Sequence, residues 1–431
     1  MTEILAEAGW SFDVLAECPG LPGTEPDVQL AGPAMIRVFP VPRRVSRSTR
    51  LVRRLRAPAA AEGIAGGSSG SGLTRTAGAK SSLARDEVRW TPVNGQLLRR
   101  TVNATLDTLD ALAWADAFAS TGRVVAQRGT HDLIISSGPP HLAHEAARRL
   151  SGELGIPFVM DMRDPWSLQQ RLVGSVASPL WFSLAEWQEA RCARAAALII
   201  ANTEAAHRAL AALYPDLTPR MLTVMNGWDD PPFRRPRPTR FDVSYIGTVY
   251  LDRNPRLLFE GFRRMLDSDP LAPGEGGITF MGPVESLDGV TVEQLAKDAG
   301  IGPYVRIQPA GSREEAMEVM KAASVLVSLP QDSDLAIPSK VFDYMTMPAR
   351  LLALATPDSA TGRVMAGLDG DLIHPDDVDG VAAALRTALR LWRRGEVFEP
   401  PGASGQYSRH EQAAKLLARL EEVRRASGRG R

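Results

Sequence analysis

Residues 136–166 read SSGPPHLAHEAARRLSGELGIPFVMDMRDPW, and this stretch carries the pattern that decides the fold. The apolar run at 131–136 that leads into it predicts a buried strand, and SGPP predicts a tight turn. Residues 141–154 then have helical periodicity that stops at Gly155, and 157–160 form a second apolar run. A strand, a helix and a strand in this order predict a parallel βαβ unit.

The alternation of helices and strands continues beyond this unit in two blocks. In the first block the predicted elements are helices at 183–196 and 204–213 and strands at 197–201 and 222–225. In the second block they are strands at 241–246, 278–281, 305–308, 324–329 and 351–354 and helices at 255–266, 292–299, 314–322 and 339–346. Two such blocks predict an α/β fold with two Rossmann-like parallel-sheet domains facing a cleft, where the carboxyl ends of the strands bind ligands.

The domain boundaries follow from shifts in composition. The segment DPPFRRPRPTR at 230–240 predicts an interdomain linker. We therefore expect a first domain at 1–235, a second domain at 236–400, and a carboxy-terminal helix within 401–431 that packs back toward the first domain. Residues 57–85 are rich in Ala, Gly and Ser and predict a flexible insert.

The overall composition excludes several classes of protein. With 431 residues, 50 Lys+Arg and 50 Asp+Glu, the chain is long enough for two domains, and its balanced charge argues against nucleic acid as a partner. Cys18 and Cys192 are the only cysteines, so we expect no disulfide framework and interpret both as buried apolar residues. We expect no metal site, although His141 and His144 lie three residues apart.

The sequence also predicts a cytoplasmic protein. No apolar run reaches the roughly 18 residues of a membrane span. The first ten residues carry Glu3 and Glu7 and lack the basic and apolar regions of a secretory signal.

Four segments in a fixed order resemble one known family. They are residues 136–166, Asn226-Gly227-Trp228-Asp229, Tyr245-Ile246-Gly247-Thr248, and the motif IPSKVFDY at 337–344. They lie between residues 136 and 344 and resemble the GT-B glycosyltransferases of family 4, a resemblance that extends over roughly residues 10–354. The resemblance implies transfer of a sugar, with retention, from a nucleotide diphosphate-sugar co-substrate to a glycan or lipid-linked acceptor. It also implies a role in bacterial cell-envelope or exopolysaccharide biosynthesis and no further cofactor.

Physical chemistry indicates how the second domain would hold such a donor. A diphosphate carries about two negative charges and suits a helix amino terminus with a nearby cation. Pro338 and Ser339 open the predicted helix at 339–346, and Lys340 adds a positive charge there. The resemblance implies that Arg253, six residues after Gly247, is the second phosphate ligand, because relatives often carry Lys or Arg there; a surface salt bridge is the alternative interpretation.

The resemblance assigns the remaining donor-side residues. Gly247 and Thr248 end the first strand of the domain, although many relatives carry Arg where this chain has Thr248. Gly311 and Ser312 are expected to read the base, and Asp343 the ribose hydroxyls. Asp334 is expected to face the sugar as a catalytic residue, with Asp332 as an equal candidate and a solvated loop as the alternative.

The first domain should bind the acceptor at the ends of its strands. The residues expected there are Gly138, which shapes a loop, and Asp161 and Arg163, which follow the strand at 157–160. Asp164 is expected to orient the acceptor hydroxyl or accept its proton, and His141 to hydrogen-bond the substrate. The alternatives are an ion pair that only holds the loop and an exposed histidine at a helix start.

One segment of the first domain is strongly basic. Eight arginines and no acid lie between Arg37 and Arg56. They predict peripheral contact with anionic lipid at the inner face of the membrane, or, alternatively, a solvated loop.

The amino-terminal end departs from the family pattern. Residues 2–9 predict the end of a helix and residues 10–16 a strand, so the strand that normally opens such a domain is missing. Either the true start lies upstream of Met1, or the chain is truncated. Two alternative functions therefore stay open: a nucleotide-sugar epimerase of the same architecture, and a truncated, non-catalytic scaffold for glycan assembly.

Overall fold

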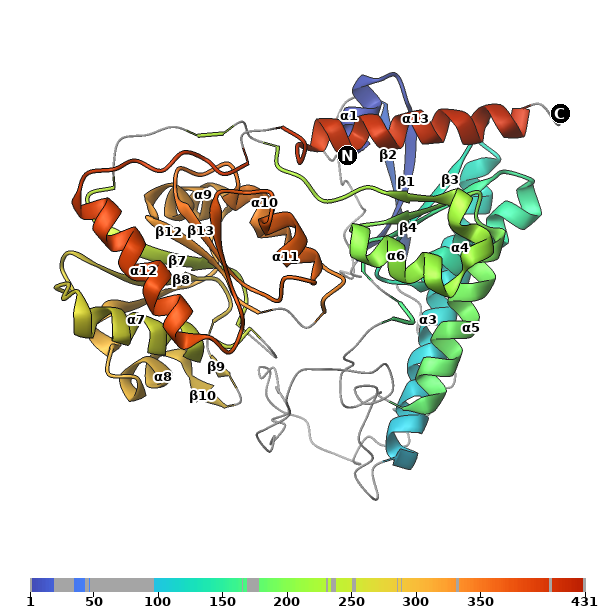
Figure 1. Cartoon of the computed structure of the whole chain (residues 1–431). Helices are drawn as coiled ribbons and strands as arrows, with labels where there is room; N and C mark the ends of the chain where they lie inside the picture. Colours follow the sequence, from blue (N-terminus) through green and yellow to red (C-terminus); the bar gives the residue numbers. More distant parts are fainter. Residues whose placement is uncertain are drawn as a thin grey trace. The chain divides into compact units, whose positions relative to one another are not determined.

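The computed structural model divides the chain into two units. It describes residues 2–18, 35–42, 46, 97–164, 166–168, 178–229, 232–233, 238–249, 253–284, 286–287, 289–330, 333–402 and 405–428. Of these, the residues up to Met225 and from Gln412 onward form the first unit, and Asn226–Glu411 form the second (Figure 1). The predicted insert at 57–85 and most of the arginine-rich segment lie outside the described residues.

The first unit contains a four-stranded parallel sheet and a separate parallel pair. The sheet order is β3 (Ile134–Gly138), β4 (Phe158–Met162), β5 (Leu198–Ala201) and β6 (Met221–Thr223). The pair consists of β1 (Phe12–Cys18) and β2 (Ile36–Pro42). In the part of the chain that the structure describes, no strand pairs with the second edge of β1 or with the outer edge of β3.

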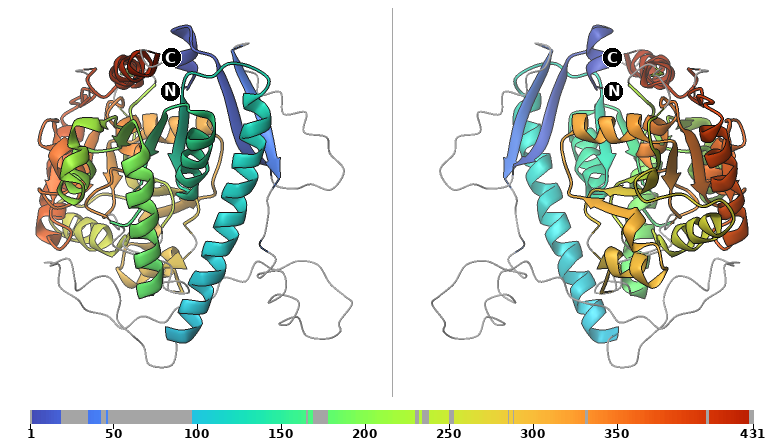
Figure 2. Two further views of the ribbon diagram at one scale, coloured as in Figure 1. Left: turned by 90° about the vertical axis from the view of Figure 1, so that its right-hand side faces the viewer. Right: turned by 90° about the vertical axis from the view of Figure 1, so that its left-hand side faces the viewer.

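The helices of the first unit surround these strands. They are α1 (Thr2–Glu7), α3 (Leu97–Ala126), α4 (Leu142–Leu154), α5 (Pro179–Ala195), α6 (Glu204–Leu213), the 3-10 turn η1 (Pro215–Arg220) and α13 (Arg409–Gly428). Figure 2 shows α3 beside β1 and β2, where the Trp114 indole N–H donates to Glu17 Oε2 at 2.8 Å. Leu416 and Leu420 of α13 are buried against Leu5 of α1 and Val159 of β4, so the carboxy-terminal helix completes a core of the first unit.

The second unit is a doubly wound domain with six parallel strands. Their order is β11 (Val305–Gln308), β8 (Gly276–Met281), β7 (Phe241–Ile246), β12 (Val325–Ser328), β13 (Arg350–Leu354) and β14 (Gly370–Ile373). The strand order reverses between β7 and β12. Ligands of open α/β sheets bind beyond the carboxyl ends of the strands at such a reversal.

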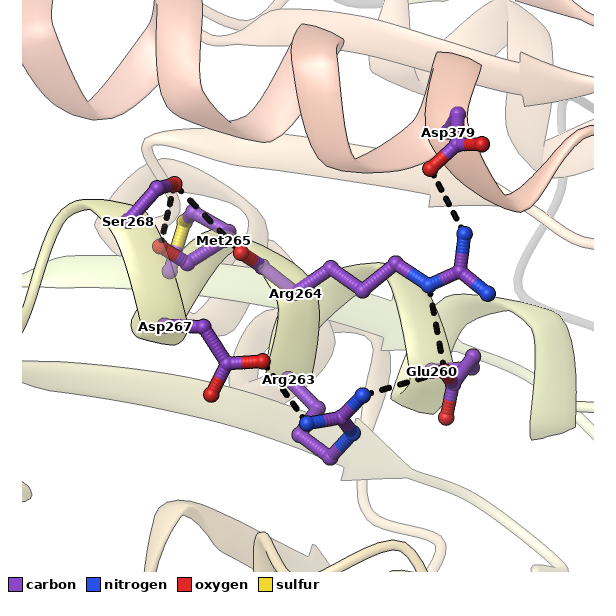
Figure 3. Close-up of polar contacts among 7 residues, drawn as sticks. All are labelled: Glu260, Arg263, Arg264, Met265, Asp267, Ser268 and Asp379. Carbon is purple, nitrogen blue, oxygen red and sulfur yellow. Dashed lines mark hydrogen bonds and ion pairs between the residues drawn. The ribbon is translucent and has the colours of Figure 1, made fainter.

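The other elements of the second unit cover this sheet. They are α7 (Arg256–Ser268), the hairpin of β9 (Ser286–Leu287) and β10 (Val290–Thr291), α8 (Val292–Asp298), η2 (Gly302–Tyr304), α9 (Arg313–Ala322), α10 (Ser339–Tyr344), α11 (Ala360–Met365) and α12 (Val378–Arg393). Helices α7 and α12 pack together through buried apolar residues, including Phe262 and Leu385. Arg264 links them at the surface by donating to Glu260 and to Asp379 (Figure 3). Such exposed pairs contribute little stability, so the apolar contact holds the two helices together.

The structure confirms the predicted α/β class and the parallel sheets in two Rossmann-like bodies. Two strands, β2 and β14, and two helices, α11 and α12, were not predicted from the sequence. Strand β2 contains Pro40 and Pro42, which a strand tolerates because it lies at a sheet edge. Helix α5 starts before the predicted residue 183, because Ser178 caps it by accepting the Trp181 N–H and Pro179 occupies the first turn.

The described part of the chain also bears on the two cysteines and on a possible membrane span. Cys192 is buried, and the side chain of Cys18 lies outside the described residues. No helix among those that the structure describes is both long enough and apolar enough to cross a membrane.

The buried contact of α13 gives a stability prediction. Leu420→Ala removes a fully buried side chain from the core of the first unit and is expected to cost about 2–5 kcal/mol of unfolding free energy. The exposed Lys415 on the same helix provides the control, Lys415→Ala, which should change the stability little. Urea unfolding measures both. Equal stability of the two variants would contradict the role of α13 in this core.

Candidate functional site

Two glycines shape the carboxyl edge of the sheet in the second unit. Gly247 follows β7 with φ +139° and donates its N–H to Met281 O at 2.8 Å. Gly282 follows β8 with φ +135°, and a Cβ atom there would lie 2.5 Å from Gly247 O. Both positions therefore need glycine, for the backbone conformation and for the close approach. The strand ends present bare backbone beside the reversal of strand order.

The ammonium group of Lys340 lies at this point. The stem of Lys340 is partly exposed, but Nζ is buried 3.5 Å from the centroid of the Tyr245 ring. Within the described residues Nζ has no hydrogen-bond partner. Burial, followed by the nearby positive charge of Arg253, holds the pKa of Lys340 well below its usual range. Since an isolated buried cation is costly, the arrangement suits an anionic ligand.

Three of the predicted donor-side residues are thereby brought together. A Cβ atom at Gly247 would lie 2.8 Å from Lys340 Nζ, so the bare strand end and the ammonium are in contact. Arg253 lies close enough to influence the pKa of Lys340. The end of β7 thus gathers two basic side chains next to a position without a side chain, a combination that suits phosphate.

Two tyrosines that the sequence analysis did not single out hold this strand end in place. The Tyr245 hydroxyl donates to the Thr248 carbonyl at 2.8 Å. The Tyr344 oxygen accepts the Ile246 N–H at 3.0 Å. Both side chains are fully buried, and burial raises the pKa of Tyr344. Each tyrosine lies inside a quoted motif, YIGT or IPSKVFDY, so the only available signal was a polar aromatic residue in an otherwise apolar pattern.

The start of α10 contributes mainly through Lys340. Pro338 precedes the helix, and its carbonyl accepts the Val341 N–H at 3.0 Å. Ser339 is exposed at the first helical position. Because α10 has only 6 residues, its dipole is small and the side-chain charge dominates.

Asp343 takes part in a chain of ion pairs. Its Oδ1 lies 3.9 Å from Arg313 Nη2, which is also 3.9 Å from Asp229 Oδ2. Asp229 in turn lies 2.9 Å from Arg409 Nη1. The predicted ribose ligand is therefore connected to the Asn226-Gly227-Trp228-Asp229 turn.

Gly311 and Ser312 form the start of α9. Ser312 Oγ accepts the Glu315 N–H, and the Glu315 carboxylate accepts the Ser312 N–H at 2.7 Å, which is a capping box. The groups expected to read the base are thus engaged with Glu315 in this structure.

The predicted sugar-facing residue lies apart from these groups. The side chain of Asp334 is exposed, and its carbonyl accepts the Ala360 N–H at 2.8 Å. No contact described for it joins Asp334 to Lys340. The alternative candidate, Asp332, lies outside the described residues.

In the first unit, the loops after four strands are tied together. Asp161 Oδ2 accepts the Ser137 hydroxyl at 3.0 Å, and its Oδ1 lies 3.5 Å from Arg163 Nη1. The Arg163 N–H donates to the Gly138 carbonyl, and its guanidinium donates to the Val224 carbonyl. Arg163 is therefore a brace between loops. Burial raises the pKa of Asp161, an effect that Arg163 and Ser137 oppose.

One further residue joins this brace, and one predicted residue lies beside it. The Asn202 side-chain amide donates to the Arg163 carbonyl. Asp164 is exposed on the same loop, open to a ligand.

A stack of neutral aromatic rings lies next to this edge. His141 stacks on Trp166 with ring centroids 5.2 Å apart and an interplanar angle of 11°. His144 is fully buried, with Nδ1 2.8 Å from Ser136 Oγ. Burial lowers the pKa of His141 to about 4 and, with a smaller effect of His141, that of His144 to about 3. Both imidazoles are neutral at pH 7 and add no charge, and the ring nitrogens of His141 are buried without a hydrogen-bond partner among the described residues.

Glu189 anchors the loop that carries Trp166, and the sequence analysis missed it. This fully buried carboxylate accepts the Ser167 N–H and hydroxyl, each at 2.8 Å, and the Tyr214 hydroxyl at 2.9 Å. Burial raises its pKa, which these hydrogen bonds oppose. No cluster of three or more candidate metal ligands occurs among the residues that the structure places.

Sequence comparison finds no relative of this chain. No protein-family model matches it, and neither does any curated protein. Structure comparison does find similar proteins. Sucrose-phosphate synthase from Thermosynechococcus elongatus is 13% identical and has a TM-score of 0.61 over 98% of this chain and 92% of its own.

A second similar structure contains a nucleotide. Anabaena HepE in complex with UDP and glucose is 14% identical, with a TM-score of 0.52 over 71% of this chain and 82% of its own. The fold is that of the GT-B glycosyltransferases. At these identities the likeness establishes the fold alone.

The neutral histidines give a pH prediction. The pKa of His144 is about 3 in the folded protein, whereas an unfolded histidine titrates near about 6.5. As the pH falls below about 6.5, the unfolded state binds a proton at His144 and the folded state does not. His144 alone should therefore lower the free energy of unfolding by about 2 kcal/mol at pH 5 relative to pH 7. Urea unfolding of the wild type and of His144→Asn at both pH values measures this difference.

The control is His410→Asn, which replaces an exposed histidine. The loss of stability between pH 7 and pH 5 should be smaller in His144→Asn than in His410→Asn. The same loss in both variants would contradict the inferred neutral state of His144.

Proposed function

We propose that this chain is a glycosyltransferase that uses a nucleotide diphosphate-sugar as donor. The observation that carries the proposal is the buried Lys340 ammonium beside Arg253 and the bare strand end at Gly247, at the reversal of strand order in the second unit. Two basic side chains match the charge of a diphosphate, and the absence of a side chain at Gly247 would let that group approach the backbone closely. The similar HepE structures contain UDP with glucose and UDP-glucose, which makes UDP the first donor fragment to test.

The same groups would promote departure of the nucleotide. As the bond from the anomeric carbon to the diphosphate breaks, negative charge grows on the leaving oxygen. Lys340 and Arg253 are placed to neutralise that charge, which preset electrostatic groups do without reorganisation. The proposal includes retention at the anomeric carbon and no metal, with Asp343 toward the ribose, Gly311 and Ser312 toward the base and Asp334 toward the sugar.

The first unit would present the acceptor hydroxyl. Its strand ends carry the neutral His141 ring, the carboxyl group of Asp161, whose pKa burial raises, and the exposed Asp164. Asp164 is the proposed proton acceptor, with Gly138 and Arg163 shaping the loop around it. Such positioning of the two reactants supplies much of the rate in the absence of a protein nucleophile. A glycan or lipid-linked acceptor in cell-envelope or exopolysaccharide synthesis, in the cytoplasm, completes the proposal.

UDP affinity should depend on Lys340. Lys340→Met removes a charge-assisted contact to the diphosphate and is expected to weaken UDP binding about 10- to 100-fold in titration calorimetry. The control is Lys297→Met, which removes an exposed lysine of the same unit and should leave the affinity unchanged. If Lys340→Met with Arg253→Gln binds UDP as tightly as the wild type, the donor site is wrong.

The reaction itself distinguishes the transferase from the epimerase. A screen of nucleotide-sugars with and without candidate acceptors should show UDP release that requires an acceptor. Interconversion of nucleotide-sugars without an acceptor would identify an epimerase instead. Absence of any nucleotide binding would favour the scaffold.

Membrane contact through residues 37–56 is a further part of the proposal. Arg37 donates to Asp13 at 2.7 and 2.9 Å, so its charge is already compensated within the protein. The other arginines of this segment, Arg43, Arg44, Arg47, Arg50, Arg53, Arg54 and Arg56, lie outside the described residues.

The lipid contact can be tested by sedimentation with vesicles. Replacement of these seven arginines by Ser should abolish co-sedimentation with phosphatidylserine vesicles, because each basic residue near an anionic surface contributes about 1 kcal/mol. Neutral phosphatidylcholine vesicles are the control and should bind neither protein. Undiminished binding of the Ser variant to the anionic vesicles would exclude this contact.

A further inference from the structure

The ammonium group of Lys340 needs a physical reason to remain at the end of β7. It is buried, Arg253 repels it, and no described residue accepts a hydrogen bond from it. The described contact that compensates its charge is the face of the Tyr245 ring, whose centroid lies 3.5 Å from Nζ. A ring face carries negative quadrupole density and attracts a cation most strongly where water is excluded.

The Tyr245 ring cannot easily turn away from this position. It is fully buried, and its centroid lies 5.6 Å from that of Phe280, which belongs to the core of the second unit. At its far end the hydroxyl donates to the Thr248 carbonyl at 2.8 Å. The ring is thus fixed by core packing along its length and by a hydrogen bond at its tip.

The other side of the ammonium group faces the backbone. A Cβ atom at Gly247 would lie 2.8 Å from Nζ, so any side chain there would displace the ammonium group. The ring face accepts no conventional hydrogen bond, so the N–H groups of Lys340 have no hydrogen-bond acceptor among the described residues.

We propose that Tyr245 is a positioning residue for the donor. Its ring holds the Lys340 ammonium at the strand end, and its hydroxyl holds the Gly247–Thr248 turn, so that the diphosphate site is set before the donor arrives. A preset site binds more tightly because less order is lost on binding. This inference rests on the proposed function and adds a residue that the resemblance to known glycosyltransferases did not supply.

Three variants of the full chain separate the parts of this role. Tyr245→Leu removes the ring and is expected to weaken UDP binding about tenfold in titration calorimetry. Tyr245→Phe keeps the ring, loses only the bond to Thr248, and should restore affinity to within about threefold of the wild type. Phe262→Leu makes a cavity in the same core, where its ring packs on Tyr304, and should bind UDP like the wild type.

A double-mutant cycle distinguishes an effect of the Tyr245 ring on Lys340 from a general disturbance of the core. If the ring acts through the ammonium group, Tyr245→Leu should add little further loss of UDP affinity in a Lys340→Met background. Fully additive losses, or equal losses in Tyr245→Leu and Phe262→Leu, would overturn the proposal. Should Tyr245→Leu fail to fold, the same cycle with Tyr245→Met replaces it.

The outcomes also separate this inference from the proposed function. Wild-type UDP affinity in Lys340→Met combined with Arg253→Gln would overturn both. Weak binding in Lys340→Met together with wild-type binding in Tyr245→Leu would overturn only the role of Tyr245.

Discussion

The main constraint at the strand ends of the second unit is a buried ammonium group, for which no described residue supplies a hydrogen-bond acceptor. Lys340 Nζ is removed from water at the end of the central strand β7, and the described contact that offsets its charge is the Tyr245 ring. Burial of a charge carries a desolvation cost, and a ligand of opposite charge would offset that cost. Gly247 leaves room for this ammonium group, because a Cβ atom there would lie 2.8 Å from Nζ, whereas Gly282 allows its own backbone to approach Gly247 closely.

The strand ends of the first unit, unlike those of the second, carry no uncompensated buried charge among the described residues discussed above. Its polar groups at the strand ends are neutral or compensated: burial keeps His141 and His144 uncharged, and Arg163 lies beside Asp161. Neutral donors and acceptors suit a hydroxyl-bearing ligand, whereas the cations of the second unit suit a phosphate. The two units thus differ in the chemistry of the ligand they favour, although both are parallel sheets with their polar residues at the carboxyl ends of the strands.

Patterns within one element could be predicted from the sequence, and contacts between elements could not. The bounds of β7 and α6 match the predicted ranges, because each has a clear apolar period and a clear stop. Strand β2 was not predicted because its prolines and its arginine interrupt the alternation of apolar and polar residues that is typical of a strand. The partnership of Tyr245 with Lys340 escaped because β7 and α10 meet only through tertiary packing. For the same reason Glu189 was missed, since its role depends on Ser167 and Tyr214 from other elements.

The segments at residues 226–229 and 405–409 add a last constraint. Trp228 donates its N–H to the Tyr407 carbonyl and accepts the Arg409 N–H, each at 3.0 Å, so the two segments run in register. Gly227 is required there because a Cβ atom would lie 2.5 Å from Tyr407 O. Arg409 also pairs with Asp229, which shares Arg313 with Asp343 of α10. The segment that leads into α13 is therefore joined by continuous polar contacts to the helix that carries Lys340.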